Sequence, residues 1–121
     1  MGTIKDAIDD MFNNELTVEE AAERHFDPFF RQRVNGMWVD RSTFLANIAS
    51  LREIVERLTI TVLDEFPDGD RYAERHLIDL SKRDGGRILQ EVYLFAERGK
   101  DGRFNRIEEA TLAIDNGSGG D

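Results

Sequence analysis

The sequence predicts an α+β fold in which helices pack on one face of a strongly curved antiparallel sheet. Apolar residues recur at helical spacing through the first half of the chain, whereas four β-rich segments separated by Gly-containing turns fill the second half. The length of 121 residues suffices for one hydrophobic core but not for two. We therefore expect one domain over residues 1–114 and a flexible C-terminal tail over 115–121, which is poor in apolar residues.

Two short helices are expected first. Segment 3–14 carries apolar residues at helical spacing, and segment 16–26 does the same. In the second segment Thr17 is followed three residues later by Glu20, which is the signature of a capping box. The proline after Asp27 ends this helix, because the residue before a proline is displaced from helical backbone angles.

A short strand and a longer helix come next. Segment 29–36 alternates loosely and closes on an Asn-Gly turn, which predicts a strand. Segment 41–58 places apolar residues at three- and four-residue steps, so it predicts the longest helix, and either Asp40 or Ser42 can cap it.

Four strands complete the predicted domain. Each ends at a turn that contains Gly next to Asp or Gly, the chemistry that a hairpin reversal requires. The predicted strands are 58–66, 71–81, 87–97 and 103–114. Their order predicts an antiparallel meander after the long helix.

The charge and composition exclude several classes of protein. A net charge of -9 argues against nucleic acid and against an anionic membrane surface, since both need clustered Lys and Arg. The chain has no cysteine, which excludes disulfides, thiolate chemistry and Cys-ligated zinc. Because no apolar run approaches ~20 residues, the expectation is a soluble cytoplasmic protein.

Three segments carry a resemblance to a known family. They read ERHFDPFFRQRVNG (23–36), DGDRYAER (68–75) and KDGRFNRIEEATL (100–112). In this order and spacing the chain resembles the nuclear transport factor 2 superfamily, and within it the SnoaL-like polyketide cyclases and ketosteroid-isomerase-like proteins. The resemblance spans roughly residues 3–114 and implies a cone-shaped curved sheet wrapped around N-terminal helices, a cystatin-like α+β barrel open to a pocket. It implies no single activity, because this fold hosts several enzymes and also proteins without catalysis.

Glu109 is the first candidate catalytic residue. The resemblance aligns it with an aspartate that serves as the base in SnoaL-like cyclases, and a desolvated carboxylate can take a proton from carbon beside a carbonyl. Strict alternation along 103–114 puts Glu109 on the less apolar face, opposite Glu108. A bulge near Asn105 would reset this alternation. Two roles stay open for Glu109: a pocket base, or a salt bridge at the surface or in a dimer.

Arg75 is the second candidate. The resemblance aligns it with an arginine that pairs with two carboxylates in the epoxide-hydrolase branch, but Leu77 stands where one carboxylate would be. The remaining hypothesis is a pair between Arg75 and Glu109, if both point inward, with a purely structural ion pair as the alternative. His76, next to Arg75, is then expected on the outer face.

Four further residues are expected to bind a ligand. Gln32 and Arg33 stand where relatives carry a Gln-His step, while Trp38 and Tyr93 each offer a hydrogen-bond donor to an apolar pocket. A solvated strand face or a packed core are the alternatives for these side chains. His25 ends the second predicted helix, where packing or capping is the expected role.

The functional hypothesis is a small-molecule-binding protein that acts as an isomerase, cyclase or dehydratase by proton abstraction on a hydrophobic carbonyl compound. No cofactor and no metal are expected. The alternative is a non-catalytic ligand-binding or dimerisation module of the same fold. A homodimer through the outer sheet face is expected in either case, because this face would otherwise expose Ile60, Leu77, one of Val62 and Leu63, and one of Val92 and Tyr93.

Overall fold

The computed structural model describes residues 2–13 and 15–114, so the predicted tail at 115–121 lies outside the described residues. The helices are α1 (Ile4–Phe12), α2 (Val18–His25) and α3 (Arg41–Ile54). The strands are β1 (Phe26–Val34), β2 (Met37–Asp40), β3 (Val55–Asp68), β4 (Arg71–Lys82), β5 (Arg87–Arg98) and β6 (Phe104–Ala113).

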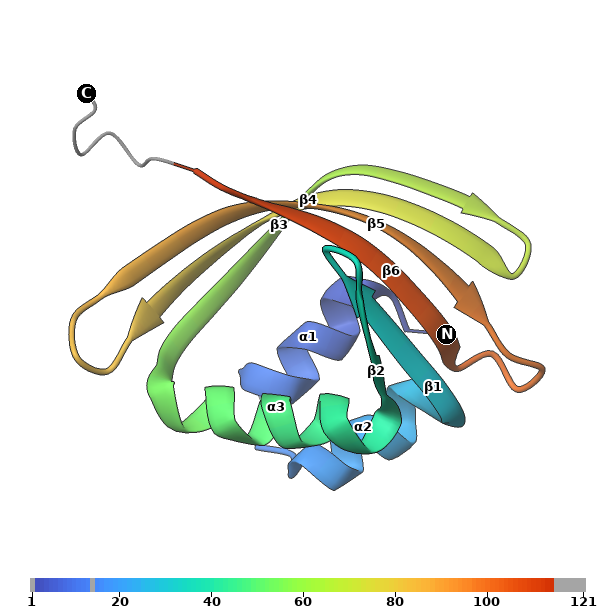
Figure 1. Cartoon of the computed structure of the whole chain (residues 1–121), viewed down its shortest axis with the longest axis horizontal. Helices are drawn as coiled ribbons and strands as arrows, with labels where there is room; N and C mark the ends of the chain where they lie inside the picture. The colour runs from blue at the N-terminus through green and yellow to red at the C-terminus, as the bar shows by residue number, and fades with distance from the viewer. Residues whose placement is uncertain (1, 14, 115–121) are drawn as a thin grey trace.

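The strands form one six-stranded sheet in the order β2-β1-β6-β5-β4-β3. Neighbouring strands are antiparallel except β1 and β6, which run parallel. Figure 1 shows the sheet arching over the helices, which lie under its concave face. The predicted α+β fold with a curved sheet wrapped around N-terminal helices is confirmed, and the sheet does not close.

Side chains cap the start of every helix. The hydroxyls of Thr3 and Thr17 each accept a hydrogen bond from the backbone N–H of the third residue of their helix, and the backbone N–H of each threonine donates to the carboxylate of that residue. Both helices therefore begin with a full capping box. Asp40 caps α3 by accepting from the amide of Thr43, which decides between the two predicted caps.

The end of α3 and one additional strand are the main differences from the prediction. Helix α3 ends at Ile54 instead of residue 58, because Val55 already pairs with Lys82 and continues into the β-branched run of β3. Strand β2 was not predicted, since four residues give too short a pattern, but it pairs with β1 across the turn at Asn35 and Gly36.

Aromatic rings hold the helices to the sheet. Phe44 of α3 lies 5.1 Å from Phe26 and 4.9 Å from Phe30, measured between ring centroids. All three side chains are buried, and they belong to the larger core cluster between the helices and the concave face. This cluster fixes the distance between α3 and β1.

Two of the bulges in the sheet decide which side chains of the site face the helices. Arg98 pairs with Phe104 and Glu97 with Arg106, so Asn105 is an extra residue in β6 and the alternation restarts after it. In β3, Val62 pairs with His76 and Asp64 with Arg75, which makes Leu63 the extra residue. The bulge that the sequence suggests near Asn105 is therefore present.

Candidate functional site

An apolar cavity of about 310 Å³ lies between the helices and the concave face of the sheet. Apolar side chains of α1, α3 and strands β3 to β6 form most of its wall. Within the described part of the chain, His76 and Glu109 are the only ionisable side chains on this wall, joined by the amides Gln32 and Gln90. A mostly apolar space with a few convergent polar groups is the usual form of a small-molecule site.

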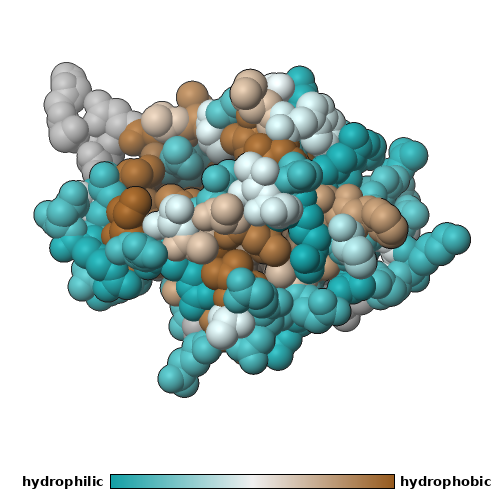
Figure 2. Space-filling view, turned by 60° about the horizontal axis from the view of Figure 1, so that its bottom comes forward, coloured by the Kyte–Doolittle hydropathy of each residue, from teal (hydrophilic) through white to brown (hydrophobic). Residues whose placement is uncertain are grey.

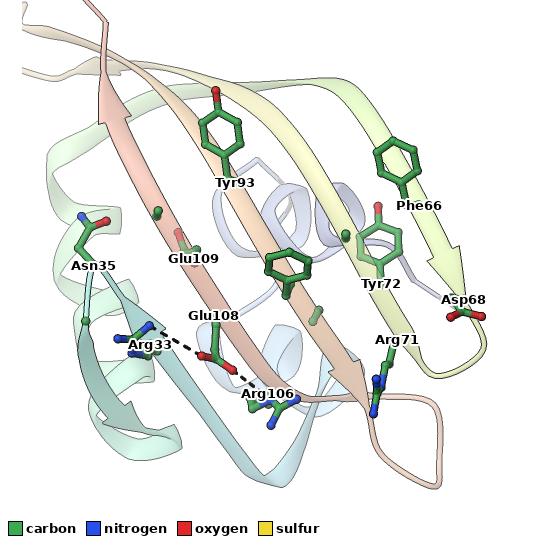
Figure 3. A pocket seen from close by; sticks show the side chains of 15 residues that line it. Arg33, Asn35, Phe66, Asp68, Arg71, Tyr72, Tyr93, Arg106, Glu108 and Glu109 are labelled. Atoms are coloured by element: carbon green, nitrogen blue, oxygen red, sulfur yellow. Dashed lines mark ion pairs between the residues drawn. The ribbon is translucent and has the colours of Figure 1, made fainter.

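Glu109 reaches this cavity because the bulge at Asn105 turns it to the concave face together with Ile107, which is 6% exposed. In Figure 3, Glu108 stands in front of the sheet while Glu109 lies behind β6. The side-chain amide of Gln32 donates a hydrogen bond of 2.8 Å to Oε1 of Glu109. Burial raises the pKa of Glu109, and the hydrogen bond from Gln32 and the proximity of His76 offset only part of this effect.

His76 enters the cavity from β4 and is 1% exposed. Its Nδ1 atom lies 2.5 Å from Oε2 of Glu74, which is 3% exposed. The other carboxylate oxygen of Glu74 contacts the hydroxyl of Tyr72, and this hydroxyl also lies 3.0 Å from Oε2 of Glu65. Burial and both carboxylates raise the pKa of Tyr72, so its phenol stays protonated.

The free side of His76 faces the cavity. Since Nδ1 is engaged by Glu74, Nε2 is the ring nitrogen left for a ligand, and no hydrogen bond to it is found among residues 2–13 and 15–114. A carboxylate bound to one ring nitrogen orients the imidazole. The cavity thus holds two groups that can accept or donate a proton, Glu109 and His76.

The cavity opens on the helix-bearing side of the molecule. The two most exposed of its apolar lining residues are Leu51 at 43% and Ile88 at 36%, so they mark its mouth. Figure 2, which brings this side forward, shows hydrophobic surface running from below the grey trace toward the centre. An apolar ligand can therefore meet apolar surface at the entrance.

Arg75 does not enter the cavity. It lies on the convex face, where it pairs with Asp64 at 2.7 Å and with Glu91 at 3.1 Å. The hypothesis of a pair between Arg75 and Glu109 is therefore wrong in its geometry, because the two side chains lie on opposite faces of the sheet. The expectation that His76 faces outward is wrong for the same reason, since adjacent strand residues point to opposite faces.

Of the four predicted ligand-binding residues, Gln32 alone lines the cavity. Arg33 is exposed and lies 3.9 Å from Glu108, and Trp38 of the edge strand β2 packs under the guanidinium of Arg31 of β1 at 4.5 Å. Tyr93 is 45% exposed on the convex face. Arg33 and Tyr93 instead line a second hollow.

This second hollow measures about 740 Å³ and lies on the convex face of the sheet (Figure 3). Its apolar part includes Phe66, which is 65% exposed, and Phe95, which is 72% exposed. Ion pairs of Glu108 with Arg33 and Arg106 cross its other side. It is larger and more open than the inner cavity, and Glu109 and Tyr72 belong to its described lining as well. His76 lines only the inner cavity, so Glu109 and His76 meet there, and the inner cavity is the better candidate for chemistry.

His25 is buried and its Nε2 lies 2.5 Å from Asp10 of α1. The pair ties α2 to α1, which agrees with the predicted packing role. Among the described residues, no group of three His, Asp or Glu side chains is placed to hold a metal ion. No helix in that part of the chain is long and apolar enough to cross a membrane.

The dyad of His76 and Glu74 was missed, although the sequence contains a signal for it. Along 71–81, His76 shares its face with Tyr72, Ile78 and Leu80, whereas Arg75 shares its face with Asp79. Counting the apolar residues at even and at odd positions separately would have predicted that His76 points inward.

An arched sheet over three helices, with an apolar cavity between them, defines the fold of nuclear transport factor 2-like proteins, and comparison with solved structures agrees. A proposed SnoaL-like polyketide cyclase from Jannaschia sp. CCS1 is similar with a TM-score of 0.67 at 15% identity, over 87% of this chain and 82% of that protein. A nuclear transport factor 2-like protein of unknown function from Exiguobacterium sp. 255-15 gives 0.69 at 18% identity, over 94% and 100%. A protein with a ketosteroid isomerase-like fold from Catenulispora acidiphila, solved in complex with trimethylamine, gives 0.60 at 10% identity, over 74% and 71%.

Sequence comparison adds one curated relative. The uncharacterized protein C11D3.04c of Schizosaccharomyces pombe is 27% identical over 107 residues, which cover 88% of this chain and 82% of that protein. No protein-family model matches the chain. At these identities the comparisons establish the fold, and the family resemblance of the sequence is confirmed at that level.

Proposed function

We propose that the inner cavity binds a compact hydrophobic carbonyl compound and that Glu109 abstracts a proton from the carbon beside the carbonyl. The observation that carries this proposal is the placement of Glu109 and His76 as the ionisable groups on an otherwise apolar wall of the described chain. A volume of about 310 Å³ is at the small end of the range for ligand pockets, which favours a ligand of one or two rings.

In the proposed reaction the carboxylate of Glu109 takes the α-hydrogen as a proton, and the electron pair of the C–H bond moves toward the carbonyl oxygen to form an enolate. Burial raises the pKa of Glu109, which makes its carboxylate a stronger base than an exposed glutamate. Gln32 holds the carboxylate in position through its 2.8 Å hydrogen bond. His76 exchanges a proton with the ligand oxygen through Nε2.

The same proton abstraction begins an isomerisation, a cyclisation or a dehydration, and these reactions differ in what the enolate does next. Structural neighbours with cyclase-like and ketosteroid isomerase-like descriptions support this group of reactions. The shape of a particular substrate would select among them.

The first test uses cyclic and aryl ketones as probes in D2O. We expect the protein to accelerate exchange of their α-hydrogens for deuterium, measured by NMR, and we expect Glu109→Gln to lose most of this acceleration while still binding. General-base catalysis contributes typically ~10²–10⁴-fold, so the loss should be at least about a hundredfold. Glu108→Gln is the matched control, because the neighbouring carboxylate lies on the convex face and should not matter. Unchanged exchange in a Glu109→Gln protein that binds the ketone would exclude Glu109 as the base.

Binding can be tested separately by filling the cavity. Ile78→Phe places a ring in the cavity, whereas Leu77→Phe adds the same ring to the opposite face of β4. Since a ligand stabilises the folded state by mass action, ketones should raise the melting temperature of the wild type and of Leu77→Phe, but not that of Ile78→Phe. Equal ketone-induced shifts in all three proteins would place binding outside the cavity.

We also propose a homodimer through the convex face of the sheet. The exposure of Phe66, Tyr93, Phe95 and Leu63 on this face supports it, and a surface with several large exposed rings is typical of an interface. Of the residues expected in this patch, Ile60 is instead buried on the concave face, because it precedes the bulge in β3.

Phe95→Glu should convert a dimer to a monomer in sedimentation velocity. A wild type that is monomeric at all concentrations would refute this arrangement.

A further inference from the structure

The polar side chains of Tyr72, Glu74 and His76 follow one another on the inward face of β4, and the bulge at Leu63 adds Glu65 at their end. Exposure rises along this series, from 1% for His76 and 3% for Glu74 to 6% for Tyr72, and Glu65 is exposed. The four side chains therefore form a hydrogen-bonded chain from the cavity to solvent.

The phenol in the middle of this chain has one proton but two carboxylate neighbours. Tyr72 can donate its proton to Glu74 or to Glu65, but not to both at once. The contact with the other glutamate is favourable only when the carboxyl of that glutamate carries a proton and donates it to the phenol oxygen. A phenol between two carboxyls is thus suited to pass a proton from one to the other.

We infer that Glu65, Tyr72 and Glu74 form a proton relay between solvent and His76. This inference rests on the proposed function, because the relay serves the proton that His76 exchanges with a ligand. Glu74 and Tyr72 are positioning and relay residues that act through His76.

The relay balances in protons. At the start Nδ1 of His76 donates to Oε2 of Glu74, Oε1 of Glu74 carries a proton and donates to Tyr72, and Tyr72 donates to the Glu65 carboxylate. When Nε2 takes a proton, the Nδ1 proton moves to Oε2, the Oε1 proton moves to the phenol oxygen, and the phenol proton moves to Glu65, which releases it to water. While Glu65 holds this proton every contact is satisfied in the opposite direction. After Glu65 releases it to water, the contact of Tyr72 with Glu65 lacks a proton until one returns to Glu65 and the steps run in reverse.

The charge change in this cycle falls on Glu65, the exposed member. His76, Glu74 and Tyr72 each begin and end neutral, so the relay avoids the large cost of a buried unpaired charge. A buried chain of this kind also shows hydrogen-bond cooperativity, because each bond polarises the next.

The experiment is NMR of ligand-free protein labelled with ¹⁵N histidine, in which the nitrogen shifts report the tautomer. The chain has two histidines, and His25 serves as the internal control because its buried carboxylate partner, Asp10, is not linked to Tyr72. In the wild type we expect both tautomers of His76 in exchange, together with exchange of its ring protons with water.

Tyr72→Phe keeps the ring and removes the relay. We expect it to fix one tautomer of His76 and to slow exchange of the Nδ1 proton by at least about tenfold, with His25 unchanged. Glu65→Gln alters an exposed side chain, so it keeps the test available if the Tyr72 variant does not fold, and it should slow the exchange as well. Equal exchange rates in the wild type and the variants, or a single His76 tautomer in the wild type, would overturn the relay. Because this measurement needs no ligand, its failure is distinguishable from failure of ketone binding or of the Glu109 base.

Discussion

Replacing Glu109 by glutamine should stabilise the protein at pH 8 and leave its stability nearly unchanged at pH 4. Burial raises the pKa of Glu109 above the ordinary value of 4.5. In the folded protein the charged form is therefore disfavoured relative to the unfolded chain, and this cost is present above the folded pKa and absent below the unfolded pKa. A neutral amide of the same shape does not carry this cost at any pH.

The size of the effect follows from the linkage between pKa and stability. Each pKa unit between the folded and unfolded states corresponds to about 1.4 kcal/mol at a pH where Glu109 is ionised. Because Gln32 donates the hydrogen bond, the substituted amide oxygen can still accept it, so little is lost there. For a chain of 121 residues, a gain of about 1 kcal/mol raises the melting temperature by about 4 °C.

The assay is thermal or urea unfolding of the wild type and Glu109→Gln at the two pH values. Glu108→Gln is the control, because its carboxylate is 35% exposed and paired with arginines on the convex face, where ion pairs contribute about 0.2–1 kcal/mol. This control should be neutral or slightly destabilising at pH 8. Two results would show that burial does not disfavour the charged form of Glu109. One is a Glu109→Gln protein less stable than the wild type at pH 8, and the other is a gain in stability at pH 4 as large as the gain at pH 8.

Three further substitutions test the fold and the assignment of faces. Phe44→Ala removes the ring that packs against β1 and should cost about 3–5 kcal/mol in urea unfolding; a loss below about 1 kcal/mol would show that the aromatic cluster does not hold α3. Gly36→Ala should cost about 1–2 kcal/mol, because Gly36 has a φ of 91°, and an unchanged unfolding midpoint would contradict this. Arg75→Gln should cost less than about 1 kcal/mol and leave ketone-induced thermal shifts unchanged, whereas loss of those shifts would show that Arg75 acts on the cavity from the opposite face.

The sequence predicts the elements of this fold well because most of them are long and strongly periodic. The capping box at Thr17 and the turn at Gly36 are local interactions, so a few adjacent residues suffice to define them. The end of α3 was misplaced because Val55 is recruited by pairing with β4, which is distant in sequence and overrides helical spacing.

The faces of the strands were harder to predict than the strands themselves. One bulge inverts every later side chain, and the bulges at Asn105 and Leu63 occur in strands where both faces carry polar residues. Family resemblance suggested that Arg75 points inward, but its partners Asp64 and Glu91 lie on neighbouring strands and on the convex face. Such cross-strand partners cannot be recognised before the register is known.

The polar groups of the concave face favour a functional cavity over a filled core. An inward hydroxyl, carboxylate and imidazole at Tyr72, Glu74 and His76 lose hydration on folding, and replacing a buried polar pair by apolar residues is often neutral or stabilising. A module that used only its convex face would be served as well by apolar residues at these three positions. Here each of the three is hydrogen-bonded, and the series ends at a cavity that also holds a carboxylate with a raised pKa, Glu109. Desolvated acids and bases that converge on one apolar space are typical of a site for proton transfer.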